Sequence, residues 1–225
     1  MMGMKKTLIY GAGGLGREIL DLLREINSLT PKYDIEGFID DGISVGSMAS
    51  GLPILGGISY IKESVREMSI VFGIVDCDIK ARLFSEINGL NRGFDFPSVV
   101  YPRSYVSPRA EIGEGTVVGR FCSVNIDAYL GRCVFLNTRC DIGHDSRIGD
   151  FCSIMPNVNI SGSVTIGERT MVGVQSAVIQ GVKVGSRVTV GMGSRVMSDV
   201  PDDCTVMGYP ARIIARHNNT GDRDC

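Results

Sequence analysis

Two stretches of the sequence contain residue types that could carry out chemistry. The chain has two histidines, His144 and His217, and His144 is followed directly by Asp145. A histidine can accept a proton near pH 7, because its ordinary pKa is about 6.5, and a neighbouring carboxylate can fix its tautomer. The second stretch is GAGGLG at residues 11–16, which satisfies the pattern G-x-G-x-x-G. Such glycines let backbone N–H groups approach a phosphate at a helix N-terminus.

The segments around the glycine-rich loop have the order of a nucleotide-binding α/β fold. Residues 5–10 are expected to form a buried strand, and residues 35–39 a second strand that ends in Asp40 and Asp41. These two acids lie about where a Rossmann-type acid meets a ribose. The helix between the strands has apolar residues on one face, namely Ile19, Leu22, Leu23 and Ile26.

The rest of this region is too short for a complete dinucleotide-binding fold. The pattern predicts a loop over residues 42–57, helices near 58–67 and 79–88, a strand at 69–73 and a last short strand before Val99. A full dinucleotide fold uses two such halves. We therefore expect no nicotinamide-dependent oxidoreductase, although the loop alone would suggest one. The alternative that the glycines only allow the helix to pack on the strand remains open.

His144 lies within a repeat of six residues that begins at Val100. Each sixth residue is aliphatic, and many of these are followed by glycine. Four residues after most of the aliphatic positions the side chain is small or β-branched, as in Cys122, Cys140 and Cys152. The aliphatic series is Val100, Val106, Ile112, Val118, Val124, Leu130, Leu136, Ile142, Ile148, Ile154, Ile160, Ile166, Val172, Val178, Val184, Val190 and Val196.

This period predicts a parallel β-solenoid with one short strand per six residues and three strands per triangular coil. An amphipathic helix would repeat every 3.6 residues, and a strand of a globular sheet would end after about 4–8 residues. Each aliphatic side chain should point inward and stack on the residue eighteen positions later. His144, two residues after Ile142, then lies on a turn with its side chain outward.

Composition excludes several classes of function. The formal net charge is −2, which gives no electrostatic case for binding nucleic acid or an anionic membrane. No apolar run approaches the ~18–20 residues that span a bilayer. The first residues lack the apolar core and cleavage site of a signal peptide, so we expect a cytoplasmic protein. The seven cysteines show no metal-ligand spacing, and we expect them to be structural.

The repeat resembles the hexapeptide-repeat acyltransferases, and the resemblance implies a left-handed β-helix. The whole chain is similar to the sugar O- and N-acetyltransferases of bacterial surface glycans, which carry a small Rossmann-like domain ahead of the helix. The expected organisation is an α/β half-Rossmann domain over residues 1–98, a β-helix over 99–214 and a flexible tail over 215–225. The resemblance also implies acetyl-CoA as co-substrate and no required metal.

The resemblance assigns roles to residues of the solenoid. The stretch 136–145 resembles the segment that holds the catalytic histidine, so His144 is expected to be the general base and Asp145 its acidic neighbour. Gly162 matches the position of an oxyanion donor. The expected acetyl-CoA contacts are Ser153, where several relatives have a second histidine, together with Val174, Met192 and Arg212.

The same resemblance implies that the N-terminal domain holds the acceptor sugar, often as a nucleotide sugar. Relatives frequently have histidine where this chain has Leu15. They also form homotrimers with the active site between subunits. The acceptor contacts carried over by position are Gly13, Gly14, Leu15, Asp40, Asp41 and Gly73.

Two other functions remain as alternatives. A γ-class carbonic anhydrase shares the fold, but its zinc needs a set of histidine ligands that one plausible histidine per subunit does not supply. A non-catalytic protein that binds a nucleotide or nucleotide sugar is the second alternative. The sequence leaves open which sugar is the acceptor and whether its nitrogen or its oxygen is acetylated.

Overall fold

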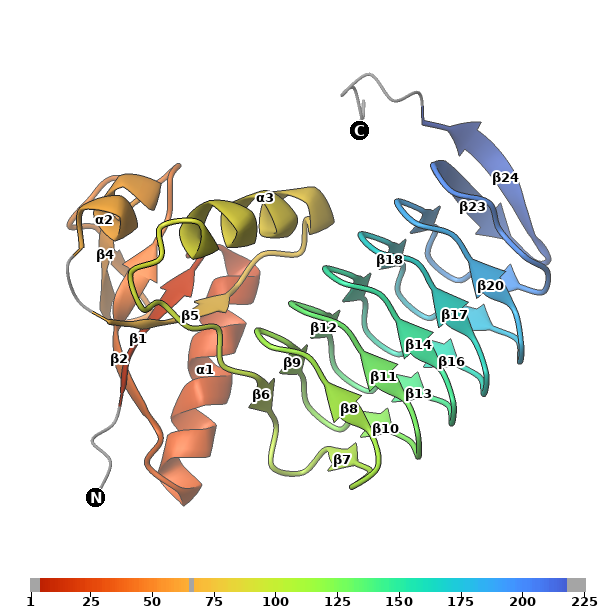
Figure 1. Cartoon of the computed structure of the whole chain (residues 1–225), viewed down its shortest axis with the longest axis horizontal. Helices are drawn as coiled ribbons and strands as arrows, with labels where there is room; N and C mark the ends of the chain where they lie inside the picture. Colours follow the sequence, from red (N-terminus) through yellow and green to blue (C-terminus); the bar gives the residue numbers. More distant parts are fainter. Residues whose placement is uncertain (1–4, 65–66, 218–225) are drawn as a thin grey trace. The chain divides into compact units, whose positions relative to one another are not determined.

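The computed structural model describes residues 5–64 and 67–217 (Figure 1). The chain divides into two compact units, Met1–Pro102 and Arg103–Cys225. The sequence placed this boundary between residues 98 and 99. The predicted fold class is confirmed, because an α/β unit is followed by a left-handed parallel β-helix.

The N-terminal unit is a small sheet in the order β3-β4-β2-β1-β5. Strand β1 lies inside the sheet and pairs in parallel with β2 and with β5. Its residues Leu8, Ile9 and Tyr10 are buried there. The buried face of helix α1 includes all four predicted apolar residues. The elements are β1 (Lys5–Tyr10), α1 (Gly14–Leu29), β2 (Tyr33–Ile39), β3 (Met48–Ala49), β4 (Leu52–Gly56), α2 (Ile58–Glu63), β5 (Ser69–Phe72), α3 (Cys77–Asn88) and β6 (Val99–Val100).

Two expectations for this unit were wrong. The segment 42–57 is no mere loop, because β3 and β4 form an antiparallel pair there and β4 adds to the sheet beside β2. The strand escaped notice because its apolar run is short and contains Pro53, yet Ile54 is buried against the sheet. Helix α2 ends at Glu63 rather than near residue 67, since Ser64 has extended backbone.

The second unit has three flat faces, which the chain visits in a fixed rotation (Figure 1). Face 1 contains β7 (Tyr105–Val106), β10 (Ser123–Val124), β13 (Asp141–Ile142), β16 (Asn159–Ile160), β19 (Ala177–Val178) and β22 (Arg195–Val196). Face 2 contains β8 (Glu111–Ile112), β11 (Tyr129–Leu130), β14 (Arg147–Ile148), β17 (Thr165–Ile166) and β20 (Lys183–Val184). Face 3 contains β9 (Val117–Val118), β12 (Phe135–Leu136), β15 (Ser153–Ile154), β18 (Met171–Val172), β21 (Thr189–Val190), β23 (Cys204–Gly208) and β24 (Ala211–Arg216).

We call the turn from face 1 to face 2 the first corner, the next turn the second corner, and the return to face 1 the third corner. The predicted register is confirmed: Ile142 pairs with Val124 in the coil before and with Ile160 in the coil after. All three side chains are buried. Stacked aliphatic residues therefore form the core of the solenoid, and each corner residue lies beside the residue eighteen positions away.

The small inner residues do more than fill space. At many inner positions a hydroxyl or thiol donates to the corner carbonyl fifteen residues later. Thr116 Oγ1 donates to the carbonyl of Gly131 at 2.7 Å, and Cys122 Sγ donates to that of Asn137 at 2.8 Å. The six cysteines of the described chain are buried and form no disulfide. These bonds provide partners for carbonyls that the tight corners turn inward.

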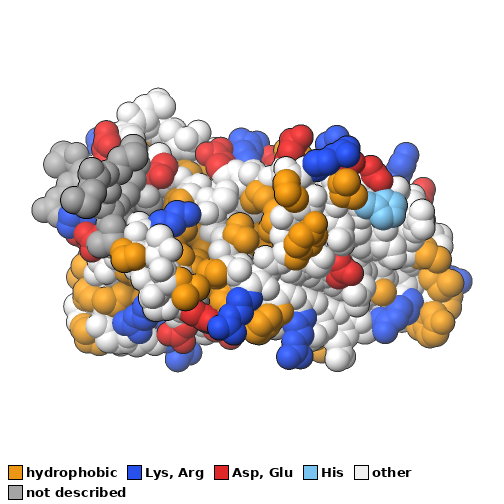
Figure 2. Space-filling view, turned by 90° about the horizontal axis from the view of Figure 1, so that it is seen from below, with side chains coloured by type: hydrophobic (Ala, Val, Ile, Leu, Met, Phe, Trp, Pro, Cys, Tyr) orange, Lys and Arg blue, Asp and Glu red, His pale blue; other side chains and the backbone are white. Residues whose placement is uncertain are grey.

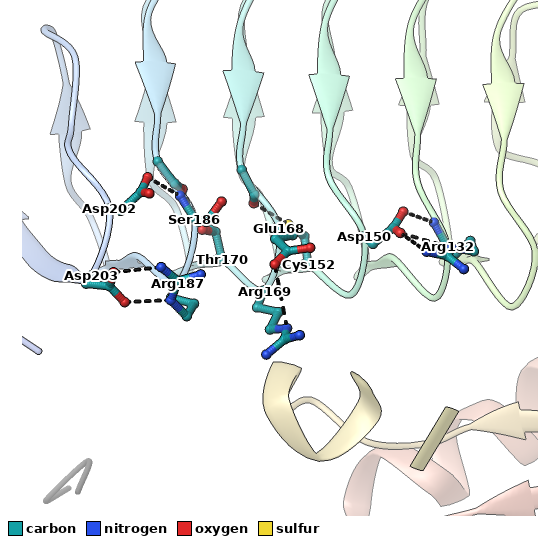
Figure 3. A network of polar contacts seen from close by, with 12 residues as sticks. Arg132, Asp150, Cys152, Glu168, Arg169, Thr170, Ser186, Arg187, Asp202 and Asp203 are labelled. Carbon is teal, nitrogen blue, oxygen red and sulfur yellow. Dashed lines mark hydrogen bonds and ion pairs between the residues drawn. The ribbon is translucent and has the colours of Figure 1, made fainter. Parts of the chain in front are cut away.

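The second corner is held on its outer side by charged pairs (Figure 3). Arg132 binds Asp150 at 2.6 Å, and Arg187 binds Asp203 at 2.6 Å. Because these pairs are partly exposed, each contributes no more than about 1 kcal/mol. We therefore assign the charged pairs of this corner a structural role.

Strand β24 closes the second unit by pairing antiparallel with β23. It extends to Arg216, past the predicted end of the β-helix at residue 214. His217 then meets Thr205, with 2.9 Å between Nε2 and Oγ1. The remainder of the predicted tail, residues 218–225 with Cys225, lies outside the described residues.

Candidate functional site

His144 and Asp145 form a hydrogen-bonded pair at the first corner. They follow β13, and Asp145 has the left-handed backbone conformation that this turn requires, with φ of +59°. The Nδ1 atom of His144 lies 2.8 Å from Oδ2 of Asp145, and the two side chains are 53% and 58% exposed. A carboxylate can only accept, so Nδ1 carries the proton and the lone pair of Nε2 is available to a ligand.

Gly162 lies one coil further along the same corner, directly against the imidazole. A Cβ at position 162 would come within 2.5 Å of both Cε1 and Nε2 of His144. The coils are joined here by the bond from the Ser163 amide to the His144 carbonyl, at 2.8 Å. Glycine at 162 is therefore the residue that leaves room for the ring.

The amide of Gly162 lacks a hydrogen-bond acceptor in the part of the chain that the structure describes, although the residue itself is buried. Its carbonyl accepts from Gly181 at 3.1 Å, but its N–H has no acceptor among the hydrogen bonds of the described residues. A Cβ on Gly143 would lie 2.5 Å from this nitrogen, so any side chain at position 143 would collide with the amide. The structure thus brings together the three residues that the sequence analysis named as catalytic.

The predicted co-substrate residues lie elsewhere on the β-helix. Val174 and Met192 stack at the third corner, where the Gly193 amide donates to the Val174 carbonyl at 2.8 Å, and Met192 is 70% exposed. Ser153 belongs to face 3 and is buried. Arg212 is exposed on β24. One chain alone does not bring these residues to His144.

A pocket of about 250 Å³ begins beside Gly162 and was missed by sequence reasoning. Ser161, Ile179 and Met197 contribute to it from three successive coils of the first corner. Their eighteen-residue spacing, which continues from Gly143 next to His144, is the signal that could have revealed it. The lining residues are Ser161, Ala177, Val178, Ile179, Arg195, Val196, Met197 and Tyr209.

In the N-terminal unit the glycines of the loop divide into two groups. Gly11 has φ of +101°, and a Cβ on Gly73 would lie 2.5 Å from the Cα of Gly16. These three glycines allow the loop, helix and sheet to approach one another. Gly13 and Gly14 are different, because they are exposed and a Cβ on either would meet nothing within 4 Å. Of the predicted acceptor residues, Gly73 is thus a packing position, whereas Gly13 and Gly14 face open space.

Asp40 and Asp41 brace this loop through hydrogen bonds. Asp40 accepts from the amides of Ala12 at 2.8 Å and Gly42 at 2.9 Å. Asp41 accepts from the Ile58 amide at 2.8 Å and from the Tyr10 hydroxyl at 2.5 Å. Burial, reinforced by Asp41, raises the pKa of Tyr10, so its hydroxyl remains a donor. The Ala12 amide is already satisfied, which leaves the uncapped first turn of α1 beside Gly13 for an anion.

Within the described ranges, no three His, Cys, Asp or Glu side chains are grouped so as to hold a metal ion. None of the described helices has both the length and the apolar content of a membrane-spanning segment. Figure 2 shows acidic and basic side chains interspersed on the face that it displays.

Comparison with known proteins gives this geometry a context. The PglD N-terminal domain family matches residues 6–87. The chain is 27% identical to GDP-perosamine N-acetyltransferase of Escherichia coli O157:H7, over 92% of this chain and 96% of that protein.

Two solved structures resemble both units together. Perosamine N-acetyltransferase of Caulobacter crescentus, solved with CoA and GDP-perosamine after a histidine was replaced by asparagine, has a TM-score of 0.86 and 27% identity. That match covers 96% of this chain and 98% of the other. The acetyltransferase domain of PglB from Neisseria gonorrhoeae, in complex with acetyl coenzyme A, has a TM-score of 0.84 and 29% identity over 94% of this chain and 100% of that one. Over nearly its whole length the protein described here is thus similar to hexapeptide-repeat sugar acetyltransferases.

Proposed function

We propose that this enzyme transfers the acetyl group of acetyl-CoA to the amino group of a nucleotide-linked sugar. The observation that carries the proposal is the His144–Asp145 pair seated on Gly162. The full-length relatives named above acetylate the nitrogen of perosamine, which favours an amine over a hydroxyl. Synthesis of surface polysaccharide in the cytoplasm is the setting that this substrate class suggests.

The site residues divide the chemistry between them. Nε2 of His144 accepts a proton from the attacking amine, while Asp145 holds the ring and stabilises its cationic form. The amine nitrogen bonds to the thioester carbon, and the Gly162 amide donates to the oxyanion. When the carbon–sulfur bond breaks, the imidazolium returns the proton to the CoA sulfur. No further co-reactant is needed.

The pocket beside Gly162 offers a path for the long arm of the donor. Ile179 and Met197 give it an apolar floor along the helix axis, and Arg195 and Tyr209 also line it. An apolar floor suits the pantetheine chain, and a guanidinium suits a phosphate. Arg212 is a second candidate for that phosphate.

A shared site in a homotrimer would explain why the predicted site residues lie at two separate corners of one chain. Val174 and Met192 lie at the third corner, whereas His144 and the pocket lie at the first corner. A neighbouring subunit packed by its third corner against this first corner would close the open side of the pocket. Ser153 is buried in the single chain, so its predicted contact with acetyl-CoA has the weakest support.

The N-terminal unit is proposed to hold the nucleotide portion of the acceptor. The first-turn amides of α1, near Gly13, Gly14 and Leu15, would bind its phosphates, because no side chain caps this helix end. Asp40 and Asp41 lie beside the loop as candidates for the nucleoside. A protein that merely binds a nucleotide is the competing function, and acetyl-CoA turnover distinguishes the two.

Replacement of His144 by alanine tests the proposed reaction. We expect kcat to fall by about 10²–10⁴-fold, because general-base catalysis is lost. The melting temperature should be unchanged, since the half-exposed ring supports no core contact. We expect the loss of kcat in Asp145→Asn to be smaller than in His144→Ala. Thiol release from acetyl-CoA with GDP- and UDP-linked amino sugars measures the effect, and near-full turnover of His144→Ala would refute the assignment.

Gly13→Val tests the proposed acceptor site. Valine fits the backbone here, with φ of −67° and ψ of −164°, and its side chain would enter open space. We expect the KM for the nucleotide sugar to rise about tenfold or more, which corresponds to about 1.4 kcal/mol. The KM for acetyl-CoA serves as the internal control and should not change. An unchanged acceptor KM, or tight NADH binding by the wild type, would rule out this role of the N-terminal unit.

Subunit mixing tests the shared site. Light scattering should give three times the chain mass of 24.2 kDa. His144→Ala and Met192→Trp should each be nearly inactive, but mixed trimers should recover activity, because some sites combine an intact His144 with an intact Met192. An active monomer, or mixed trimers without recovery, would contradict a site between subunits.

A further inference from the structure

The buried hydroxyl of Ser146 touches both sides of the turn that contains Gly162. Its Oγ donates to the Ser161 carbonyl at 2.8 Å and accepts from the Val164 amide at 3.2 Å. The side chain has no exposed surface, so it meets no substrate. Neither the repeat pattern nor the family resemblance assigns it a role in the reaction.

The position of this hydroxyl is unusual within the repeat. At the second and third corners the inner slot often holds a hydroxyl or thiol. At the first corner the six inner slots hold Ala110, Ala128, Ser146, Val164, Val182 and Val200. The single polar residue of this series therefore serves the one corner turn that contains Gly162. A solely structural need would not explain a hydroxyl in this coil alone, because alanine or valine fills the same slot in the neighbouring coils.

Peptide geometry links Ser146 to the proposed oxyanion donor. The Ser161 carbonyl and the Gly162 N–H belong to one planar trans peptide group and point in opposite directions. Since Ser146 holds the carbonyl toward the interior, the N–H is turned outward. That is the side on which the imidazole of His144 lies against Gly162.

We infer that Ser146 is a positioning residue that aims the Gly162 amide at the reacting carbonyl. Its hydrogen bond resists rotation of the 161–162 peptide and keeps the seat of the His144 ring in place. The inference rests on the proposed function, because it assumes that Gly162 donates to the oxyanion.

Ser146→Ala tests the inference with a variant that should fold, because Ala110 and Ala128 fill the same slot in the two preceding coils. We expect kcat to fall about 10–100-fold, since a lost oxyanion donor costs about 10²–10³-fold and a misdirected one less. The KM values should change little, and kcat/KM should keep its pH profile because the base is intact. Ser146→Val, which gives this slot the same side chain that Val164 provides in the next coil, is a second test of the same loss.

Two further variants separate positioning from stability. Ser146→Cys should restore most of kcat, because Cys152 makes the equivalent bond to Gly167 at 3.0 Å. Thr170→Val removes a matching pair of bonds, to the Gly185 carbonyl at 2.8 Å and from the Val188 amide at 3.1 Å, at the second corner. It should lower the melting temperature about as much as Ser146→Ala does, but leave kcat unchanged.

The outcomes distinguish this inference from the proposed function. Wild-type kcat in Ser146→Ala, beside a large loss in His144→Ala, would overturn the inference and leave the function standing. Equal losses of kcat in the alanine and cysteine variants, or a comparable loss in Thr170→Val, would also overturn it. Full turnover by His144→Ala would instead overturn the proposed function.

Discussion

The parallel ladder between coils is the interaction on which the rest of the structure depends. Bonds such as that from the Gly143 amide to the Ile160 carbonyl, at 2.7 Å, fix a register of eighteen residues. That register stacks the aliphatic core, and the same register places His144 against Gly162. A slip of one residue in one coil would turn core residues outward and separate the imidazole of His144 from Gly162. Folding and site assembly are thus consequences of one geometric repeat.

The tight corners impose a second constraint, since they turn backbone carbonyls toward an apolar interior. An unpaired buried carbonyl costs about 1–3 kcal/mol, so hydroxyls and thiols at the inner slots stabilise the corners. Ser146 shows how such a structural device can also serve chemistry. The bond that satisfies the Ser161 carbonyl determines where the neighbouring N–H points. In the N-terminal unit, Asp40 has a related effect, because it occupies the Ala12 amide and leaves the helix N-terminus as the open anion site.

The sequence alone predicted the solenoid because its period is long and unbroken, and it predicted the outward direction of His144 from its distance to Ile142. It did not predict β4, since a four-residue apolar run containing proline resembles a loop. The pocket at Ile179 and Met197 was also missed, although both follow Gly143, the neighbour of His144, at the repeat spacing. Hydrogen bonds such as those of Ser146 and Asp40 depend on side-chain direction, which residue type does not specify. The assignment of Val174 and Met192 to the site stays a prediction that requires a neighbouring subunit.

The most direct test of the account is whether His144 and Gly162 act as one unit. The methyl group of Gly162→Ala would lie 2.5 Å from two atoms of the imidazole and must displace it, so kcat should fall about 10²-fold. In a His144→Ala background the same change should cost almost nothing, because no ring remains to be displaced. Measured kcat values for the two single variants and the double variant decide the matter. Strongly non-additive losses are the predicted result, and losses that simply multiply would contradict the account.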